Sequence, residues 1–147
     1  MSEFDREALF VSKIIQTQKV WGLKSNAGFA TLASNEFENE EGQPIPIVCF
    51  WSDKKSAVTI KKKHWKNFVP VEISISEFLE KWCVGVYNDE LLIGTNIDLK
   101  LARLESEPLP LAIKILEGLK NTDVRLHLNS FEDASELEHK IREINAE

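Results

Sequence analysis

The strongest pattern along the chain is an uninterrupted apolar run, Ile47–Trp51, which follows Pro44-Ile45-Pro46. No polar residue breaks the run, which is rich in β-branched and aromatic residues and too short for a buried helix. These properties predict a central strand that is covered on both faces. Because the two prolines lack an amide donor, we expect full ladder pairing only from Ile47 onward.

Five other stretches carry the apolar spacing or the capping residues of helices. Ser2 and Ser52 are expected N-caps, and Ser74-Ile75-Ser76-Glu77 is a capping box. Pro108 and Pro110 mark the first turn of another helix. The predicted helices cover Glu3–Gln18, Asp53–Trp65, the stretch from Ser74 to Val86, Pro108–Leu119 and Phe131–Asn145. In the first of these, the expected inward stripe is Phe4, Ala8, Val11 and Ile15, widened by Phe10 and Ile14.

Shorter apolar or alternating stretches predict the remaining strands. A hairpin is expected from Val20–Leu23 and Gly28–Ala33, where Gly22 indicates a bulge or a close backbone approach. Pro70 places the strand Val69–Ile73 at an edge or a strand start. The other predicted strands are Leu91–Ile97 and a last short one carrying Val124, Leu126 and Leu128, while Ser34–Gln43 is expected to be a polar loop and Lys100–Glu107 has no assigned structure.

Together these elements predict an α+β fold, with a mixed or mostly antiparallel sheet and helices packed against it. The chain has 147 residues, of which 43% are hydrophobic, so we expect a single domain over residues 1–147. The net charge of -6 disfavours nucleic acid as a partner, because such binding depends on neutralising phosphates.

Several kinds of chemistry lack their usual residue patterns. The three histidines are isolated, and Cys49 and Cys83 lie in separate apolar runs, which is typical of buried free thiols and not of a metal site. Glycine-rich phosphate loops and the Gly-x-Ser-x-Gly motif are absent. We therefore expect no metal, no cofactor and no catalytic residues, and an enzyme is the less favoured class. The charged N-terminus and the lack of a long apolar run predict a cytoplasmic protein without a membrane segment.

Two clusters of opposite charge are the candidate binding surfaces, and the candidate residues are Glu36, Phe37, Glu38, Glu40, Glu41, Lys61, Lys62 and Lys63. The acidic cluster offers a recognition loop for a basic partner, with Phe37 as an apolar anchor. The lysines, which follow Lys54 and Lys55 along the same predicted helix, offer an anion-binding patch. Both clusters are also typical of solvated surface, which is the more common role of such charges, and lysines at a helix C-terminus complement the helix dipole.

A non-catalytic protein-interaction module, of the immunity or inhibitor kind, is the favoured function. The alternative is a small-molecule-binding protein or enzyme, with a pocket walled by tryptophans and a polar group from Asp98, His64 or Glu72. The last predicted helix has a narrow seam that suits peripheral packing or a homodimer. That seam consists of Ala134, Leu137, Ile141 and Ile144.

A set of apolar and tryptophan positions resembles a family of small bacterial proteins known as domain of unknown function 2750. The residues that carry the resemblance are Val20–Leu23, Trp51-Ser52-Asp53 with Ala57, Trp65, Val71–Ile73, Phe78–Trp82 and Ile93–Asn96. The resemblance covers roughly Phe10 to Ile97 and implies a bacterial cytoplasmic protein, with no known reaction and no catalytic residues. Two features depart from it: a longer approach from Pro46 to Trp51, and a C-terminal extension over residues 121–147.

Overall fold

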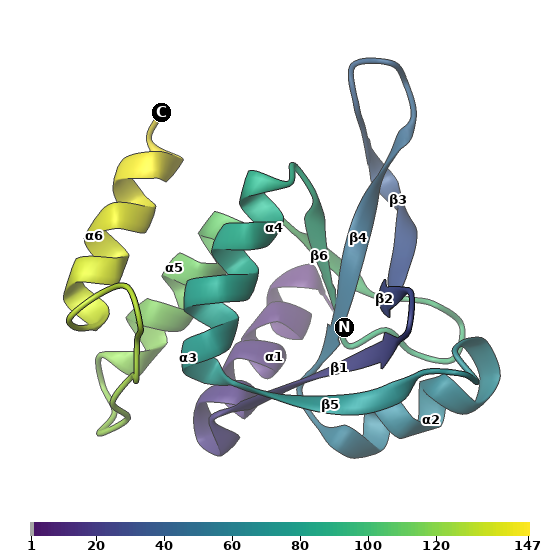
Figure 1. Cartoon of the computed structure of the whole chain (residues 1–147), viewed down its shortest axis with the longest axis horizontal. Helices are drawn as coiled ribbons and strands as arrows, with labels where there is room; N and C mark the ends of the chain where they lie inside the picture. Colours follow the sequence, from purple (N-terminus) through teal and green to yellow (C-terminus); the bar gives the residue numbers. More distant parts are fainter. Residues whose placement is uncertain (1) are drawn as a thin grey trace.

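The computed structural model describes residues 2–147, apart from the side chains of Glu3 and Phe4. Over this part of the chain, seven strands form one mixed sheet, and helices pack on both of its faces (Figure 1). The predicted α+β class is confirmed. The elements in chain order are α1 (Glu3–Thr17), β1 (Lys19–Ser25), β2 (Gly28–Phe29), β3 (Thr31–Glu38), β4 (Pro44–Trp51), α2 (Lys54–His64), β5 (Val69–Ser74), α3 (Ile75–Glu77), the π-helical η1 (Phe78–Cys83), α4 (Val84–Asn88), β6 (Leu92–Thr95), β7 (Leu104–Ser106), α5 (Pro108–Leu119) and α6 (Ala134–Asn145).

The predicted central strand is β4. It pairs antiparallel with β1 and β3 on one side and parallel with β6 on the other, where the ladder runs from Ile47 to Phe50. Pro44 and Pro46 pair only with β3, so the prolines lie outside the β6 ladder as their missing amides require.

Two hydrophobic cores cover the two faces of β4, as the unbroken apolar run predicts. Val48 and Phe50 belong to the larger core, which fills the space between the sheet and α1, α3 to α4, and α5. Cys49 and Trp51 belong to a smaller core beneath α2, where Trp51 meets Trp65 edge to face. Each fully buried large side chain contributes roughly 1.5–3 kcal/mol, so the strand stabilises both layers at once.

The local capping signals locate most helix starts correctly. The hydroxyls of Ser2 and Ser74 accept hydrogen bonds from the amides three residues ahead, at 3.2 Å and 3.1 Å. The predicted Ser52 cap is wrong: Asp53 caps α2 by accepting from the Ser56 amide at 2.8 Å. The amide and hydroxyl of Ser52 instead both donate to Oδ1 of Asn96.

Several other sequence-based boundaries need correction. In α1 the fully buried side chains are Phe10 and Ile14, Ala8 is exposed, and the expected role of Phe4 lies outside the described residues. Helix α6 begins three residues later than predicted, at Ala134. At Gly22, where a bulge or a close backbone approach was predicted, the close neighbour is a side chain, since a Cβ there would lie 2.7 Å from the Phe29 ring.

The predicted last strand is wrong, because the stretch from 123 to 128 is not paired in the sheet. Its alternating apolar side chains are half-buried against the larger core. Its backbone is held by side chains instead of a ladder: the His127 amide donates to the Ser76 hydroxyl at 2.8 Å, and the amides of Asn129 and Ser130 donate to the Glu80 carboxylate. Alternation alone does not distinguish such a stretch from a strand.

Candidate interaction surfaces

The predicted polar loop Ser34–Gln43 is largely a strand and a tight turn, which corrects the sequence-based expectation. β3 continues to Glu38, and the β3–β4 hairpin projects from the sheet as an arm (Figure 1). At its tip, Oδ1 of Asn39 accepts hydrogen bonds from the amides of Glu41 and Gln43, at 2.9 Å and 3.0 Å. The acidic residues therefore sit on an ordered turn.

A large bulge separates the arm from the body of the sheet. Ala33 pairs with Pro46 and Glu38 pairs with Pro44, so residues 34–37 lie opposite Ile45 alone. Neither proline can donate a ladder hydrogen bond, so β3 loses little by departing from β4 at this point.

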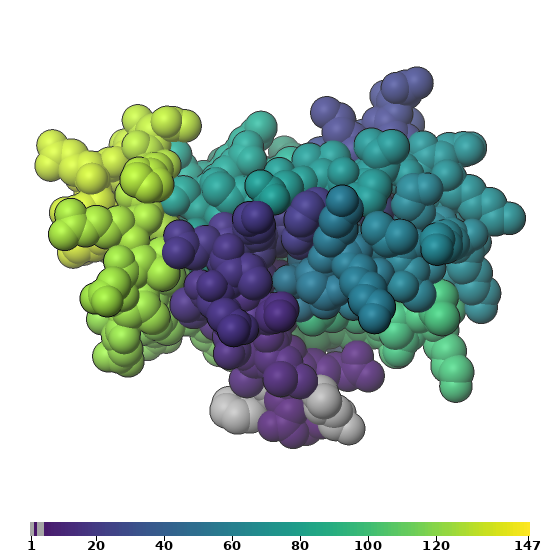
Figure 2. All heavy atoms as spheres, turned by 90° about the horizontal axis from the view of Figure 1, so that it is seen from below, coloured from purple at the N-terminus to yellow at the C-terminus, as the bar shows by residue number. Residues whose placement is uncertain are grey.

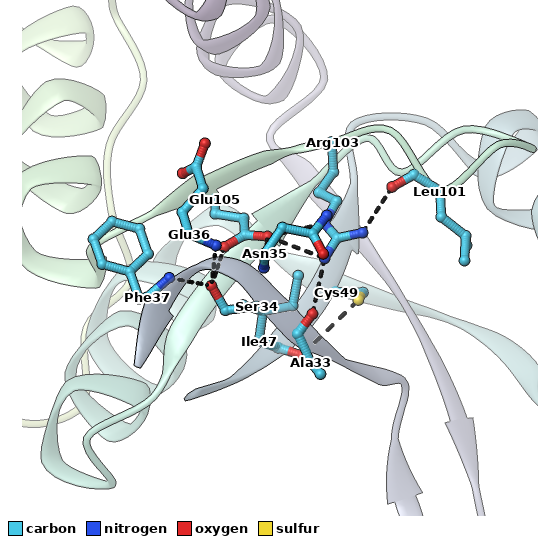
Figure 3. Close-up of polar contacts among 10 residues, drawn as sticks. All are labelled: Ala33, Ser34, Asn35, Glu36, Phe37, Ile47, Cys49, Leu101, Arg103 and Glu105. Atoms are coloured by element: carbon cyan, nitrogen blue, oxygen red, sulfur yellow. Dashed lines mark hydrogen bonds and ion pairs between the residues drawn. The ribbon is translucent and has the colours of Figure 1, made fainter. Parts of the chain in front are cut away.

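Side chains from two distant segments hold the bulge in place (Figure 3). The Ser34 hydroxyl accepts hydrogen bonds from the amides of Glu36 and Phe37, at 3.0 Å and 2.8 Å, and donates to Oε1 of Glu105 on β7. The other carboxylate oxygen of Glu105 accepts from the Asn35 amide at 3.0 Å. The base of the arm is thus tied to β7 through a single carboxylate.

An ion pair completes this network. Nη2 of Arg103 lies 3.0 Å from Oε2 of Glu105, and the two side chains are only 6% and 3% exposed. The same guanidinium donates to the carbonyl oxygens of Leu101 and Ala33, both at 2.9 Å. Burial by itself would raise the pKa of Glu105, but the Asn35 amide, the Ser34 hydroxyl and Arg103 together lower it below the ordinary value. The carboxylate is therefore held ionised, which suits a structural anchor and not a proton acceptor.

The arm shares an acidic hollow of about 560 Å³ with the turn that follows α4. Three of the candidate residues, Glu38, Glu40 and Glu41, lie on one side of it, and Asp89 and Glu90 lie on the other. Ile45 and Pro46 supply an apolar part of the wall. Sequence reasoning missed the Asp89–Glu90 turn as part of this surface, because about fifty residues separate the turn from the acidic cluster in the chain.

The other two acidic-cluster candidates lie outside that hollow. Glu36 belongs to the bulge, where its amide is bound by Ser34. The side chain of Phe37 is 37% exposed and lines a separate hollow with residues of β7 and α5. The structure therefore brings together three of the five predicted residues and places Phe37 against the sheet edge.

The candidate lysines lie in the last turn of α2, where they complement the helix dipole. Nζ of Lys61 donates to the Lys66 carbonyl at 3.3 Å, and Nζ of Lys63 donates to the Leu99 carbonyl at 3.4 Å. Lys62 is exposed. The helix and the arm tip lie at opposite ends of β4 (Figure 1). The chain thus carries opposite charges at the two ends of its central strand.

The residues proposed for a tryptophan-walled pocket have other surroundings. Trp51 is fully buried and its indole N–H donates to the Ile97 carbonyl at 3.0 Å. The hollow that Asp98 lines contains no tryptophan. Nε2 of His64 lies 3.1 Å from the Leu99 carbonyl oxygen, and Glu72 forms an ion pair with Lys19 on the surface.

The two thiols are buried and free, as expected. Burial raises the pKa of Cys49 to about 12; the charge of Arg103 lowers this pKa and the charge of Glu105 raises it. Burial also raises the pKa of Cys83, by more than that of Cys49. They belong to different cores. Among residues 2–147, apart from the two side chains excluded above, no group of three or more His, Cys, Asp or Glu is placed to hold a metal ion.

The seam of α6 is used within the chain. Leu137 and Ile141 are buried in the larger core beside α5, and Ala134 and Ile144 pack partly against it. Glu138 accepts from Lys120, the C-cap residue of α5, at 3.1 Å. A homodimer through this helix stays a prediction, which the mass measured by light scattering would test.

Fold and surfaces together define a small α+β protein with an acidic arm at one end of its central strand and a lysine-rich helix at the other. The family model described as Protein of unknown function (DUF2750) matches residues 8–115, and the chain belongs to that family. The match extends further than the Phe10–Ile97 resemblance and ends within α5. No curated protein and no solved structure matches the chain. None of the described helices has the length and apolar character needed to cross a membrane.

Proposed function

We propose that the chain is a non-catalytic protein-interaction module of the bacterial cytoplasm, and that its acidic arm binds a basic protein partner. The observation that carries the proposal is the acidic hollow, in which carboxylates of the arm and of the Asp89–Glu90 turn surround an apolar wall. A basic side chain with an apolar stem matches both parts of such a surface.

The arm is suited to binding because its shape exists before the partner arrives. The Asn39 turn orders its tip, and the Ser34–Glu105 contact fixes its base. A preorganised surface loses less conformational entropy on association than a disordered loop of the same composition. The concentration of carboxylates also accelerates encounter with a positively charged partner.

The test is affinity capture with the full-length chain, followed by mass spectrometry of the bound proteins. The arm variant carries Glu38→Lys, Glu40→Lys and Glu41→Lys. The matched control carries Asp123→Lys, Glu132→Lys and Glu147→Lys, which make the same change of charge at exposed positions of the C-terminal segment. Basic partners are expected with the wild type and the control, and not with the arm variant.

Salt provides a second readout. At about 1 M salt, where the screening length is roughly 3 Å, the captured proteins should be released. Circular dichroism should show that the arm variant is folded, because its three substitutions lie at exposed positions. Capture of the same proteins by the arm variant and the wild type would refute the proposal, as would a captured set without a basic surface.

A further inference from the structure

A second hollow, of about 540 Å³, lies at the opposite end of β4 from the arm. It sits beyond the carboxyl ends of β4 and β6, which are parallel neighbours. From β4 the chain continues through α2 to β5, which pairs with β1 toward one edge of the sheet. From β6 it continues to β7, which lies toward the opposite edge. In sheets with parallel strands, ligands commonly bind in the crevice where the chain departs in opposite directions.

The floor and one wall of this hollow are apolar. Ile60 on α2 and Ile97 after β6 are buried at 1% and 2% exposure, whereas Leu99 is 44% exposed. Leu99 belongs to an ordered turn, because Oδ1 of Asp98 accepts from the amides of Lys100 and Ala102, at 2.9 Å and 3.0 Å. This turn and α2 lie side by side at one end of the molecule, opposite the C-terminal segment (Figure 2).

The rim of the hollow is positively charged. Lys55 and Lys100 line the hollow, and Nζ of Lys63 donates to the carbonyl oxygen of Leu99, a lining residue. Two carboxylates oppose this charge, that of Asp98 in the lining and that of Asp53 at the N-cap of α2. Counted formally, the three lysines against these two carboxylates leave +1, which is opposite in sign to the net charge of -6 of the whole chain.

We propose that this hollow binds an acidic peptide segment in which one apolar side chain is flanked by carboxylates. The apolar side chain packs on Ile60, Ile97 and Leu99, and the flanking carboxylates pair with Lys55 and Lys100. The apolar floor favours a peptide over nucleic acid, whose phosphates and sugars carry no alkyl side chain that could enter the hollow. The exposed rim, which includes Ser56 and Thr59, suits a segment lying across the surface better than an enclosed metabolite. This site is independent of the acidic arm and binds a partner segment of the opposite charge.

Fluorescence anisotropy with the full-length protein tests the proposal. The probe is a labelled short peptide with one leucine between two pairs of glutamates, and the comparison peptide has glycine in place of leucine. The leucine peptide should bind at least tenfold more tightly than the glycine peptide, because only the leucine reaches the apolar floor. The amide signals of α2 and of residues 96–100 should shift in NMR titrations with the leucine peptide.

Two variants and one control separate the contributions. Lys55→Glu with Lys100→Glu should weaken the leucine peptide at least tenfold, and Leu99→Asp should abolish the preference for leucine over glycine. The control, Lys13→Glu with Lys140→Glu, makes the same change of charge at exposed positions elsewhere and should leave the affinity within about twofold.

Three results would overturn the inference. One is equal binding of the two peptides, and another is equal weakening by the rim variant and the control. The third is tighter binding of a single-stranded oligonucleotide of the same charge. All variants alter exposed residues, so a native circular dichroism spectrum is expected for each of them.

Discussion

Replacement of Glu105 by glutamine is expected to destabilise the protein strongly although it changes the shape of the side chain very little. Arg103 would remain in place, 6% exposed and without its counter-charge. Breaking a buried ion pair by removing one partner typically costs about 3–5 kcal/mol, because the remaining charge is not compensated. The carboxamide also has to place its NH₂ group either toward Arg103 and Asn35, which are both donors, or toward the Ser34 hydroxyl, whose oxygen already accepts from two amides.

Urea unfolding followed by tryptophan fluorescence measures this loss, with Trp51 and Trp65 as buried reporters. The matched control is Glu72→Gln, which removes the charge of the Lys19–Glu72 pair, whose side chains are 50% and 51% exposed. That substitution should change the free energy of unfolding by less than about 1 kcal/mol. If Glu105→Gln changes the free energy of unfolding as little as the control, the network does not anchor the arm as described.

The pH dependence supplies an independent check on the same residue. The pKa of Glu105 is lowered in the folded state relative to its ordinary value of 4.5. The ionised carboxylate therefore stabilises the fold above pH 4.5, and this contribution is lost as the pH falls from 4.5 through the lowered pKa. The difference in stability between the wild type and Glu105→Gln should accordingly shrink on acidification, and a difference that grows would contradict the assignment.

Three further predictions concern stability and reactivity. Ser106→Ala should leave stability unchanged or raise it by about 1 kcal/mol in urea unfolding, because the buried Ser106 hydroxyl has no hydrogen-bond partner among the described residues; a clear loss would reveal a partner. Gly94→Ala should lower the free energy of unfolding by about 1–3 kcal/mol, since its Cβ would lie 2.7 Å from Cδ1 of buried Ile47. Gly85→Ala, which has open space around it in α4, should raise the free energy of unfolding by about 0.5–1 kcal/mol. Equal effects of the two substitutions would contradict the packing. Neither Cys49 nor Cys83 should react with a thiol reagent in the native protein, and both should react after unfolding; rapid labelling of the native protein would contradict their burial and raised pKa values.

The features predicted correctly from the sequence are those with a local physical signal. The unbroken apolar run of β4 indicates burial on both faces whatever its neighbours are. The caps at Ser2 and Ser74 also act within a single turn. So does Pro108 at the start of α5, because the first residue of a helix donates no intrahelical hydrogen bond and a proline is therefore tolerated there.

The features that were missed depend on residues far apart in the chain. β7 is three residues long and has no periodicity of its own, so only its pairing with β6 defines it. The hydrogen bond between Ser34 and Glu105 joins residues 71 positions apart, and no local sequence pattern predicts that they meet. The strand predicted near Leu126 is wrong for the converse reason. Its apolar residues do alternate, but the His127 amide donates to a side-chain hydroxyl and not to a neighbouring strand.

The proline-flanked bulge makes the length of the arm independent of the register of the sheet. Residues 34–37 already lie opposite Ile45 alone, and the anchoring contacts through Glu105 lie below the tip. Residues inserted or deleted between Asn39 and Gln43 would therefore leave the alignment of β4 with β1 and β6 unchanged. The tip is a position where evolution can vary the length of a loop, and where a foreign epitope can be grafted for display, without redesigning the scaffold.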